Sequence, residues 1–330
     1  MIVVTGAYGF IGSCMIAHLN KLGFNDIVAV DDLTAFNKTP NLIGKKCCKV
    51  IDRTIFLDWF KENSKGTDCV IHLGARTDTT EADARIFEKL NVEYSKTLYK
   101  ICEKRSIPFL YASSAATYGD GEFGFSDAKQ DGILKLKPLN PYGVSKNEFD
   151  KWLYKLSKSK PQNTFWAGFK FFNVYGPNEY HKGRMASTIF HFYNQILRDK
   201  LVRLFESHKK EIANGEQQRD FIYIRDVLSI LEFFMKNYKI IPSGVYNVGT
   251  GKARSFNDVV NNVFQNLNVP ENVVYIPTPQ DIRESYQYFT QADTRRLRNI
   301  AGYTKPFTTL EDGIADYVTN YLKGTRYFNY

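Results

Sequence analysis

The residues that most directly suggest chemistry are Tyr142 and Lys146, the first and last residues of the segment YGVSK. Residues four positions apart lie on one face of a helix, so both side chains would project in the same direction. A second segment, YASSAATYG at 111–119, supplies Ser113 and Ser114 near the end of a predicted strand. A phenol, an ammonium group and a serine hydroxyl held together can move a proton to or from a hydroxyl group of a sugar.

A glycine-rich segment, TGAYGFIG at residues 5–12, lies between a predicted strand and a predicted helix. Its glycines have the spacing GxxGxxG instead of the more usual GxGxxG. Gly6 would permit the turn, Gly9 would let the backbone approach a pyrophosphate, and Gly12 would allow close packing of helix on strand. The N–H groups at the start of the helix would face the diphosphate. Together with the Tyr142–Lys146 pair, this segment predicts a redox enzyme with a dinucleotide.

Two acidic residues, Asp31 and Asp32, close the second predicted strand about 20 residues further on, as this type of fold requires. A carboxylate at this position accepts hydrogen bonds from the adenosine ribose, which favours NAD. Lys38 and Arg53 could instead neutralise a 2′-phosphate, which favours NADP, or could be solvated surface charges. The residues alone leave this choice open.

The elements that must position these residues alternate along the first half of the chain. Strands are predicted at 2–5, 26–31, 69–73, 108–112 and 164–172, and helices at 10–22, 85–105 and 145–158. This alternation predicts an α/β fold with a doubly wound parallel sheet and helices on both faces. We expect residues 1–172 to bind the dinucleotide and residues 173–330 to form a smaller substrate lobe. A helix at 226–238 and a strand at 244–248 would return to the main sheet.

The bulk composition favours a globular cytoplasmic protein. The chain has 330 residues, 43% hydrophobic and 15% aromatic, and no run near the ~20 apolar residues of a membrane helix. The predicted strand at 2–5 leaves no room for a cleavable presequence. The net charge of +9 is dispersed, so we expect no nucleic-acid partner. Five cysteines without CxxC spacing favour reduced thiols over disulfides, and we expect no metal site.

The motifs TGAYGFIG, YASSAATYG and YGVSK together resemble the extended short-chain dehydrogenase/reductase superfamily. Further motifs resemble one group within it, the ADP-L-glycero-D-manno-heptose 6-epimerases, over essentially the whole chain. They are FFNVYGP at 171–177, EYHKGRMAS at 179–187, RDFIY at 219–223, YNVGTG at 246–251 and YQYFTQAD at 286–293.

This resemblance implies a mechanism for making bacterial lipopolysaccharide precursors. Bound NADP⁺ takes a hydride from C6 of the heptose and returns it to the other face of the transient ketone, so the centre is inverted without net redox change. Tyr142 and Lys182 are implied as the two acid–base groups, and Ser114 as a hydrogen-bond partner of the reacting oxygen. Lys146 would lower the pKa of Tyr142 and bind the nicotinamide ribose. Members of this group are often pentameric, so we expect a homo-oligomer.

The resemblance also implies binding positions beyond the glycines. Cofactor contacts are implied for Phe10, Ile11, Asp31, Asp32, Lys38, Arg53, Leu73, Gly74, Ala75, Arg76, Thr77, Asn91, Lys146 and Val174. Substrate contacts are implied for Ser114, Asn173, Arg184, His191, Phe205, Glu206, Ser207, His208, Arg219 and Tyr286. The guanidinium group of Arg219 could bind the diphosphate through paired hydrogen bonds.

Three features depart from the pattern of this group. Asp32 stands where an asparagine is usual and adds negative charge beside any 2′-phosphate, Arg184 replaces a serine, and the stretch 209–218 is longer. One alternative is a UDP-sugar 4-epimerase or a 4,6-dehydratase of the same fold. The dehydratases carry an Asp-Glu pair that this chain lacks. The other alternative is a protein that senses NADP without turnover, but such proteins usually lose the Tyr/Lys pair.

Overall fold

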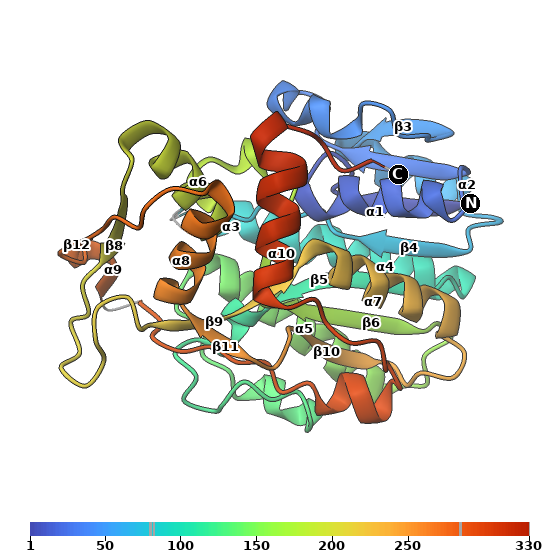
Figure 1. Cartoon of the computed structure of the whole chain (residues 1–330). Coiled ribbons are helices and arrows are strands. Elements are labelled where there is room, and N and C mark those ends of the chain that lie inside the picture. The colour runs from blue at the N-terminus through green and yellow to red at the C-terminus, as the bar shows by residue number, and fades with distance from the viewer. Residues whose placement is uncertain (79–80, 82, 284–285, 330) are drawn as a thin grey trace.

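The computed structural model describes residues 1–78, 81, 83–283 and 286–329. Within these residues the central sheet has seven parallel strands in the order β10-β6-β5-β4-β1-β2-β3 (Figure 1). The strands are β1 (Ile2–Thr5), β2 (Ile27–Asp31), β3 (Lys49–Asp52), β4 (Cys69–His72), β5 (Phe109–Ser114), β6 (Trp166–Phe171) and β10 (Gly244–Val248). The predicted doubly wound parallel sheet is confirmed, although β3 was missed.

Helices cover both faces of this sheet. One face packs against α1 (Phe10–Lys21) and α7 (Ile224–Asn237). The other packs against α2 (Arg53–Asn63), α4 (Tyr94–Arg105) and α5 (Pro141–Ser159). Side chains alternate along each strand, so Val4 belongs to the first core and Val3 to the second. Both faces of the sheet are therefore covered by apolar side chains, as is typical of parallel sheets.

The helix predicted at 85–105 has the expected extent but an irregular middle. It begins as α3 (Ala84–Phe87), passes through a π-helical turn at Glu88–Glu93 and continues as α4. A π-helical turn inserts an extra residue and changes the direction of the side chains around it. Asn91 lies in this turn and is buried.

The helix predicted at 145–158 begins four residues earlier than expected, at Pro141. The side chain of Asn140 accepts a hydrogen bond from the N–H of Gly143 and so caps the helix. Proline at the first helical position needs no hydrogen-bond partner for its nitrogen. The Asn-Pro pair was a start signal that the sequence analysis overlooked, and it places Tyr142 in the first turn.

Most of the remaining elements lie beside the carboxyl end of the main sheet, on the left of Figure 1, whereas α10 (Leu310–Asp316) lies near the centre of the view. They include a three-stranded sheet of β7 (Asn173–Tyr175), β9 (Gln218–Tyr223) and β11 (Ala253–Ser255), and a pair formed by β8 (Val202–Phe205) and β12 (Val273–Ile276). The helices here are α6 (Thr188–Asp199), α8 (Phe256–Leu267), α9 (Gln280–Arg283) and α10 (Leu310–Asp316). One hydrophobic core continues from α1 and α7 into α6, α8 and α10. A division into two lobes near residue 172 stays a prediction.

All strands of the main sheet are parallel, so their carboxyl ends meet at one edge. The loops after β1, β4 and β5 leave from that edge, and ligands of such sheets bind there. A search of the helices in the described residues finds none long and apolar enough to span a membrane.

Candidate active site

The glycine-rich loop between β1 and α1 is shaped by contacts that side chains would block. Gly6 has φ +68°, a conformation that other residues rarely adopt. A Cβ atom on Gly12 would lie 2.0 Å from the carbonyl oxygen of Gly6. Gly9 caps α1 without a side chain, and no described group accepts from the N–H groups of residues 10–12. The start of α1 therefore presents free donors to an anion.

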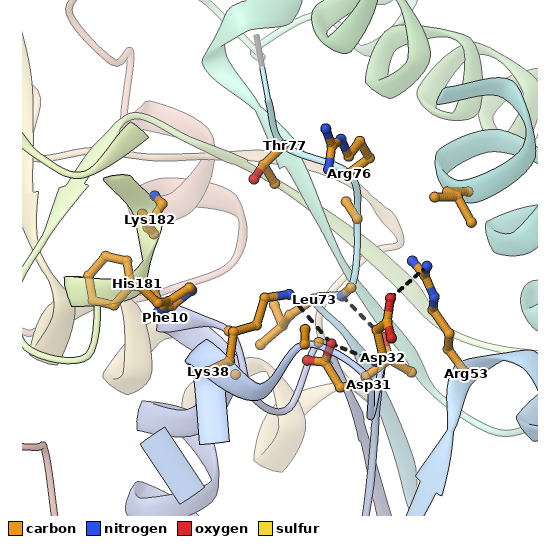
Figure 2. Close-up of a pocket in the computed structure, with 18 of the residues that line it drawn as sticks. Phe10, Asp31, Asp32, Lys38, Arg53, Leu73, Arg76, Thr77, His181 and Lys182 are labelled. Atoms are coloured by element: carbon orange, nitrogen blue, oxygen red, sulfur yellow. Dashed lines mark hydrogen bonds and ion pairs between the residues drawn. The ribbon is translucent and has the colours of Figure 1, made fainter. Parts of the chain in front are cut away.

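This loop forms one wall of a cavity of about 770 Å³ at the carboxyl edge of the sheet. Figure 2 shows Lys182 and His181 on one side of the view, and Arg53 with Asp32 on the other. A volume of this size is typical of cofactor sites. The predicted site residues that line the cavity are Gly6, Gly9, Phe10, Ile11, Gly12, Asp31, Asp32, Lys38, Arg53, Leu73, Gly74, Ala75, Arg76, Thr77, Lys182 and Arg184.

Two acidic side chains at one end of the cavity each form an ion pair with a basic side chain. Lys38 Nζ lies 3.7 Å from Oδ1 of Asp31, and the guanidinium group of Arg53 lies 2.9 Å from Asp32 (Figure 2). Hydrogen bonds from Thr34, together with the charge of Arg53, hold the pKa of Asp32 below its usual value. A ribose could bind with both pairs closed, whereas a 2′-phosphate would require at least one pair to open.

Asn91 lies behind the loop 73–77 and not in the cavity wall. Its side-chain oxygen accepts from the N–H of Arg76 at 2.8 Å. Its amide group donates to the Arg76 carbonyl at 3.0 Å and to the Ser145 hydroxyl at 2.9 Å. Both amide hydrogens are used in this way. In this structure Asn91 shapes the loop, and the direct cofactor contact expected for it stays a prediction.

His72 fixes the start of the same loop as a neutral imidazole. Ser95 Oγ donates to the Asn91 carbonyl at 2.6 Å, so it accepts from Nε2 of His72 at 2.8 Å. The other ring nitrogen, Nδ1, then accepts from the Thr5 hydroxyl at 2.6 Å, and that hydroxyl accepts from the N–H of Gly74. Burial lowers the pKa of His72 to about 3, which keeps the ring uncharged.

Tyr142, Ser114 and Lys146 form a second group, which lies outside the wall of that cavity. Tyr142 is half-buried in the first turn of α5, and its side chain hydrogen-bonds with the hydroxyl of Ser114 at the end of β5. Lys146 is buried one turn later, and its Nζ donates to the Ala112 carbonyl at 2.8 Å. The structure thus brings together the three groups whose spacing suggested proton transfer.

The pKa of Tyr142 is raised in this structure, and the lowering effect expected from Lys146 stays a prediction. Burial raises the pKa of Tyr142, the hydrogen bond from Ser114 opposes this rise, and the charge of Asp150 adds to it. Burial also lowers the pKa of Lys146 to about 8. The physical reason is that removing the phenol from water outweighs its hydrogen bond, while the Lys146 ammonium group is directed at the Ala112 carbonyl.

Lys182 projects into the cavity from a 3₁₀ segment, Tyr180–Met185. Its Nζ lies 5.5 Å from the centre of the Phe10 ring, and burial lowers its pKa. Glu179 opposes that shift and anchors the segment, because its carboxylate accepts from the N–H and the hydroxyl of Ser187, both at 2.6 Å. A lysine with a lowered pKa gives up its proton more readily than an ordinary lysine, which suits a group that transfers protons.

Four other predicted residues, one of them in this segment, differ in how far they are buried. Arg184 is exposed at the cavity wall, and its carbonyl lies 3.3 Å from Nε2 of His191 on α6. Asn173 is exposed at the start of β7. Val174 is half-buried beside the hydrophobic core and does not line the cavity. Direct ligand contacts of Asn173, Val174 and His191 stay predictions.

Arg219 is a buried cation on β9 that has no acidic partner among the described side chains. Its guanidinium group donates to the backbone carbonyls of Gln218 and Gln287, and it lies between the rings of Phe256 and Tyr286, 5.7 and 5.6 Å from their centres. Burial lowers its pKa to about 10, so the group remains charged at neutral pH. An anion that reached Arg219 would supply the missing counter-charge.

An aromatic cluster adjoins Arg219 and contains most of the predicted nucleotide-side residues. Tyr286 packs against Phe205 and His208, with ring centres 6.4 and 6.2 Å apart. The hydroxyl of Tyr288 accepts from the N–H of His208 at 2.8 Å. Ser207 donates to the carbonyl of Lys209, while the N–H of Glu206 pairs with β12. This surface can stack a planar base beside the buried cation.

Comparison with known proteins identifies the family of this chain. The profile of the NAD dependent epimerase/dehydratase family matches residues 2–249. The chain is 46% identical over 331 residues to the ADP-L-glycero-D-manno-heptose-6-epimerase of Fusobacterium nucleatum subsp. nucleatum, covering 98% of each chain. It is 44% identical over 324 residues to the enzyme of the same name from Nitratidesulfovibrio vulgaris, again covering 98% of each.

The chain belongs to the NAD dependent epimerase/dehydratase family. The resemblance predicted from its motifs is confirmed. A crystal structure of the Helicobacter pylori ADP-L-glycero-D-manno-heptose-6-epimerase aligns with a TM-score of 0.81 and 32% identity, over 97% of this chain and 95% of that one.

The nicotinamide dinucleotide that gives the family its name fits the residues of the cavity. The loop offers unpaired N–H groups to a diphosphate, and Gly6 and Gly12 leave room that a Cβ atom would fill. Asp31 and Asp32 stand where the adenosine ribose of such a cofactor is held. Lys146 and Tyr142 are placed at the carboxyl edge of the same sheet.

Asn41 is a positioning residue that the sequence analysis missed. Its amide donates to the carbonyls of Tyr8 and Asn178, at 2.9 and 3.0 Å, and lies 3.1 Å from Nδ1 of His181. It therefore ties the glycine-rich loop to the segment that carries Lys182. These partners are up to 140 residues apart in sequence, so no local spacing could reveal them. Missed cavity-lining residues are Thr5, Val30, Ala35, Asn37, Asp78, Ile86, Leu90, Tyr94, His181 and Met185.

Replacing Gly12 should weaken dinucleotide binding. In Gly12→Ala the added methyl group would overlap the Gly6 carbonyl, so α1 must move away from the loop. We expect a lower Tm and at least a tenfold weaker dinucleotide affinity in a calorimetric titration. Gly132→Ala is the matched control, because a Cβ atom there meets nothing within 4 Å. Equal effects of the two substitutions would contradict this account of the loop.

Proposed function

We propose that this chain is an isomerase that converts ADP-D-glycero-β-D-manno-heptose to ADP-L-glycero-β-D-manno-heptose at C6, for lipopolysaccharide core precursors. The observation that carries the proposal is the presence of two acid–base candidates, Tyr142 in the first turn of α5 beside Ser114 and Lys182 in the cavity wall. Full-length similarity to enzymes named for this substrate supports it.

The chemistry explains why two such groups are needed. C6 of the heptose has no neighbouring carbonyl, so its hydrogen is not acidic and direct deprotonation cannot invert it. The bound dinucleotide would supply a reversible hydride acceptor. A carbon that is oxidised on one face and reduced on the other needs a proton acceptor and a proton donor on opposite sides. Tyr142 serves one face and Lys182 the other, while Ser114 donates a hydrogen bond to the reacting oxygen.

The rest of the sugar nucleotide would be held by the C-terminal elements. Arg219 binds the diphosphate, whose charge compensates the buried guanidinium group. The ring cluster of Phe205, His208 and Tyr286 stacks on the adenine base. Arg184, at the cavity wall beside Lys182, would contact the sugar or its phosphate.

We propose NADP as the specific cofactor, with Lys38 and Arg53 binding the 2′-phosphate. Both side chains line the adenosine end of the cavity, and each is paired with a carboxylate that the phosphate would replace as its partner. An ion pair that is partly exposed contributes little free energy, so its opening costs little. Asp32 works against this choice, because its charge would face the phosphate.

NADP should be released when the purified protein is denatured, and mass spectrometry would identify it. Arg53→Leu should weaken NADP binding about tenfold and leave NAD binding unchanged, since a charge-assisted contact to phosphate is worth about 1.5–3 kcal/mol. Asp32→Asn should instead strengthen NADP binding. Lys61→Leu, on the exposed face of the same helix, is the control. Release of NAD alone would contradict the 2′-phosphate assignment.

ADP-D-glycero-D-manno-heptose should be converted to an equilibrium mixture with its L-glycero epimer without added cofactor. Because the hydride stays on the enzyme, the product formed in D₂O should carry no deuterium at C6, which NMR can measure. Turnover of UDP-galactose or GDP-mannose in place of the ADP-heptose would show the substrate assignment to be wrong, and the first variant to test would then be Arg184→Ser.

Tyr142→Phe and Lys182→Met should each lower kcat at least ~10²-fold, the usual effect of removing a positioned acid or base. Both variants should keep their fold and their cofactor. Each should also retain one half-reaction, which a dismutation assay on an aldehyde analogue of the sugar would detect. Lys239→Met, an exposed lysine away from the cavity, is the control. Wild-type activity in Lys182→Met would exclude Lys182, and His181 would be examined next.

A further inference from the structure

A fully buried ion pair lies directly behind the proposed acid–base group. Asp150 on α5 and Lys170 on β6 have no exposed side-chain surface, and Nζ of Lys170 lies 2.8 Å from Oδ2 of Asp150. Tyr142, Lys146 and Asp150 are spaced four residues apart on α5, so they form one stripe along the helix. The reaction proposed above does not use this pair.

The Asp150 carboxylate joins α5 to the two neighbouring strands. Its Oδ1 accepts from the Tyr111 hydroxyl at 2.9 Å, and its Oδ2 accepts from the Ser113 hydroxyl at 2.7 Å as well as from Lys170. Ser113 precedes Ser114, the partner of Tyr142. A carboxylate with three donors around it fixes the end of β5 against α5.

Lys170 extends the same network to the turn after β5. Its Nζ donates to the Thr117 hydroxyl and lies 5.1 Å from the centre of the Tyr118 ring. The Thr117 hydroxyl in turn donates to the Ser114 carbonyl at 2.7 Å. Asp150 thus holds Ser113 from one side, and Lys170 holds the backbone of Ser114 from the other.

Stability alone does not explain the pair. A buried ion pair can often be exchanged for apolar residues of similar volume with little loss, whereas removal of one partner leaves an uncompensated charge. The charged groups that face Lys146 and Tyr142 are therefore informative. From α5 both groups meet Asp150, and from β4 Lys146 meets His72, which is neutral, while Lys170 on β6 lies 2.8 Å from the Asp150 carboxylate. The phenols of Tyr111 and Tyr118 remain protonated because burial raises their pKa.

We propose that Asp150 and Lys170 form a charge-balanced positioning pair: Asp150 fixes Ser113 and Ser114 against α5, and Lys170 cancels the field that Asp150 exerts on Lys146 and Tyr142. The assignment of roles to Tyr142 and Lys146 rests on the proposed function. The charge of Asp150 raises the pKa of both groups, so an unbalanced carboxylate would hold their protons more tightly. One and two helical turns correspond to about 6 and 12 Å along the axis. At an effective dielectric constant of about 20, a unit charge at 12 Å shifts a titration by about one pH unit.

The proposal is tested by NMR titration of protein labelled with ¹³C at the lysine Cε, with the Lys146 signal assigned by its loss in Lys146→Arg. Lys170→Met should raise the Lys146 midpoint by about one pH unit or more, and Asp150→Asn should lower it. The double variant Asp150→Asn/Lys170→Met should titrate like the wild type, and Lys170→Arg should do so too. Tyr111→Phe, which removes one contact of Asp150 but no charge, is the control and should leave the midpoint unchanged.

Kinetics supply a second measurement on the same proteins. Lys170→Met should lower kcat at pH 7 about tenfold and shift its acidic limb upward, with KM for the sugar nucleotide unchanged, and Lys170→Arg should restore activity. The proposal is overturned, and the pair has only a structural role, in either of two cases. Either the Lys146 midpoint moves in the same direction in both single variants, or it stays unchanged while Tm falls. If the single variants do not fold, the double variant decides alone. A Lys146 midpoint that differs from the wild-type value by a pH unit or more in that variant overturns the proposal. The titration needs no turnover, so failure of the substrate assay leaves this test intact.

Discussion

The site depends first on how closely α1 can approach the end of β1. A Cβ atom on Gly12 would lie 2.0 Å from the Gly6 carbonyl, and one on Gly6 would overlap the backbone of Gly74. Backbone therefore meets backbone on both sides of the loop, from α1 and from the loop after β4. This contact aims the start of α1 at the cavity, and Asp31 closes the loop from β2 by accepting from the N–H of Tyr8 at 2.8 Å. The hydrogen-bond donors at this end of the cavity are backbone N–H groups at the start of α1. They depend on the close approach of the backbone and not on any side chain.

The second constraint is the stripe of Tyr142, Lys146 and Asp150 on α5. Each residue meets a different part of the sheet edge: Tyr142 meets Ser114, Lys146 meets the Ala112 carbonyl, and Asp150 meets Ser113 with Lys170. Because all three come from one rigid helix, a change in the position of α5 would disturb every contact together. The cap at Asn140 and the amide of Asn91, which donates to Ser145, fix where that helix starts. Tyr142 and Lys146 are therefore positioned by the contacts of α5 with the sheet edge and by the residues that fix where α5 begins.

The sequence predicted those parts of the fold that are encoded locally. The glycine spacing, the Tyr142–Lys146 pair and the buried strands are patterns within a few residues, and the structure contains each of them. The short strand β3 was missed, because two of its four residues are exposed and it has no apolar run. Contacts between distant segments, such as Asn41 with His181 and Asp150 with Lys170, carry no sequence periodicity. The pKa of Tyr142 likewise depends on the whole fold, because burial and the charge of Asp150 raise it and outweigh the hydrogen bond from Ser114.

Lys182 shows how a side chain on a short 3₁₀ segment can be held in place. Its segment begins after Asn178, whose φ is +77° and whose side chain donates to the Ser13 hydroxyl on α1 and accepts from the N–H of Phe328 in the C-terminal segment. Glu179, fully buried, accepts from Ser187 at the start of α6. The segment is thereby tied to α1, α6 and the C-terminal end of the chain. The Nζ of Lys182 lies 5.5 Å from the centre of the Phe10 ring, which stabilises the ammonium cation without accepting its proton. The backbone of the segment is thus anchored by its neighbours while the Lys182 side chain lines the cavity.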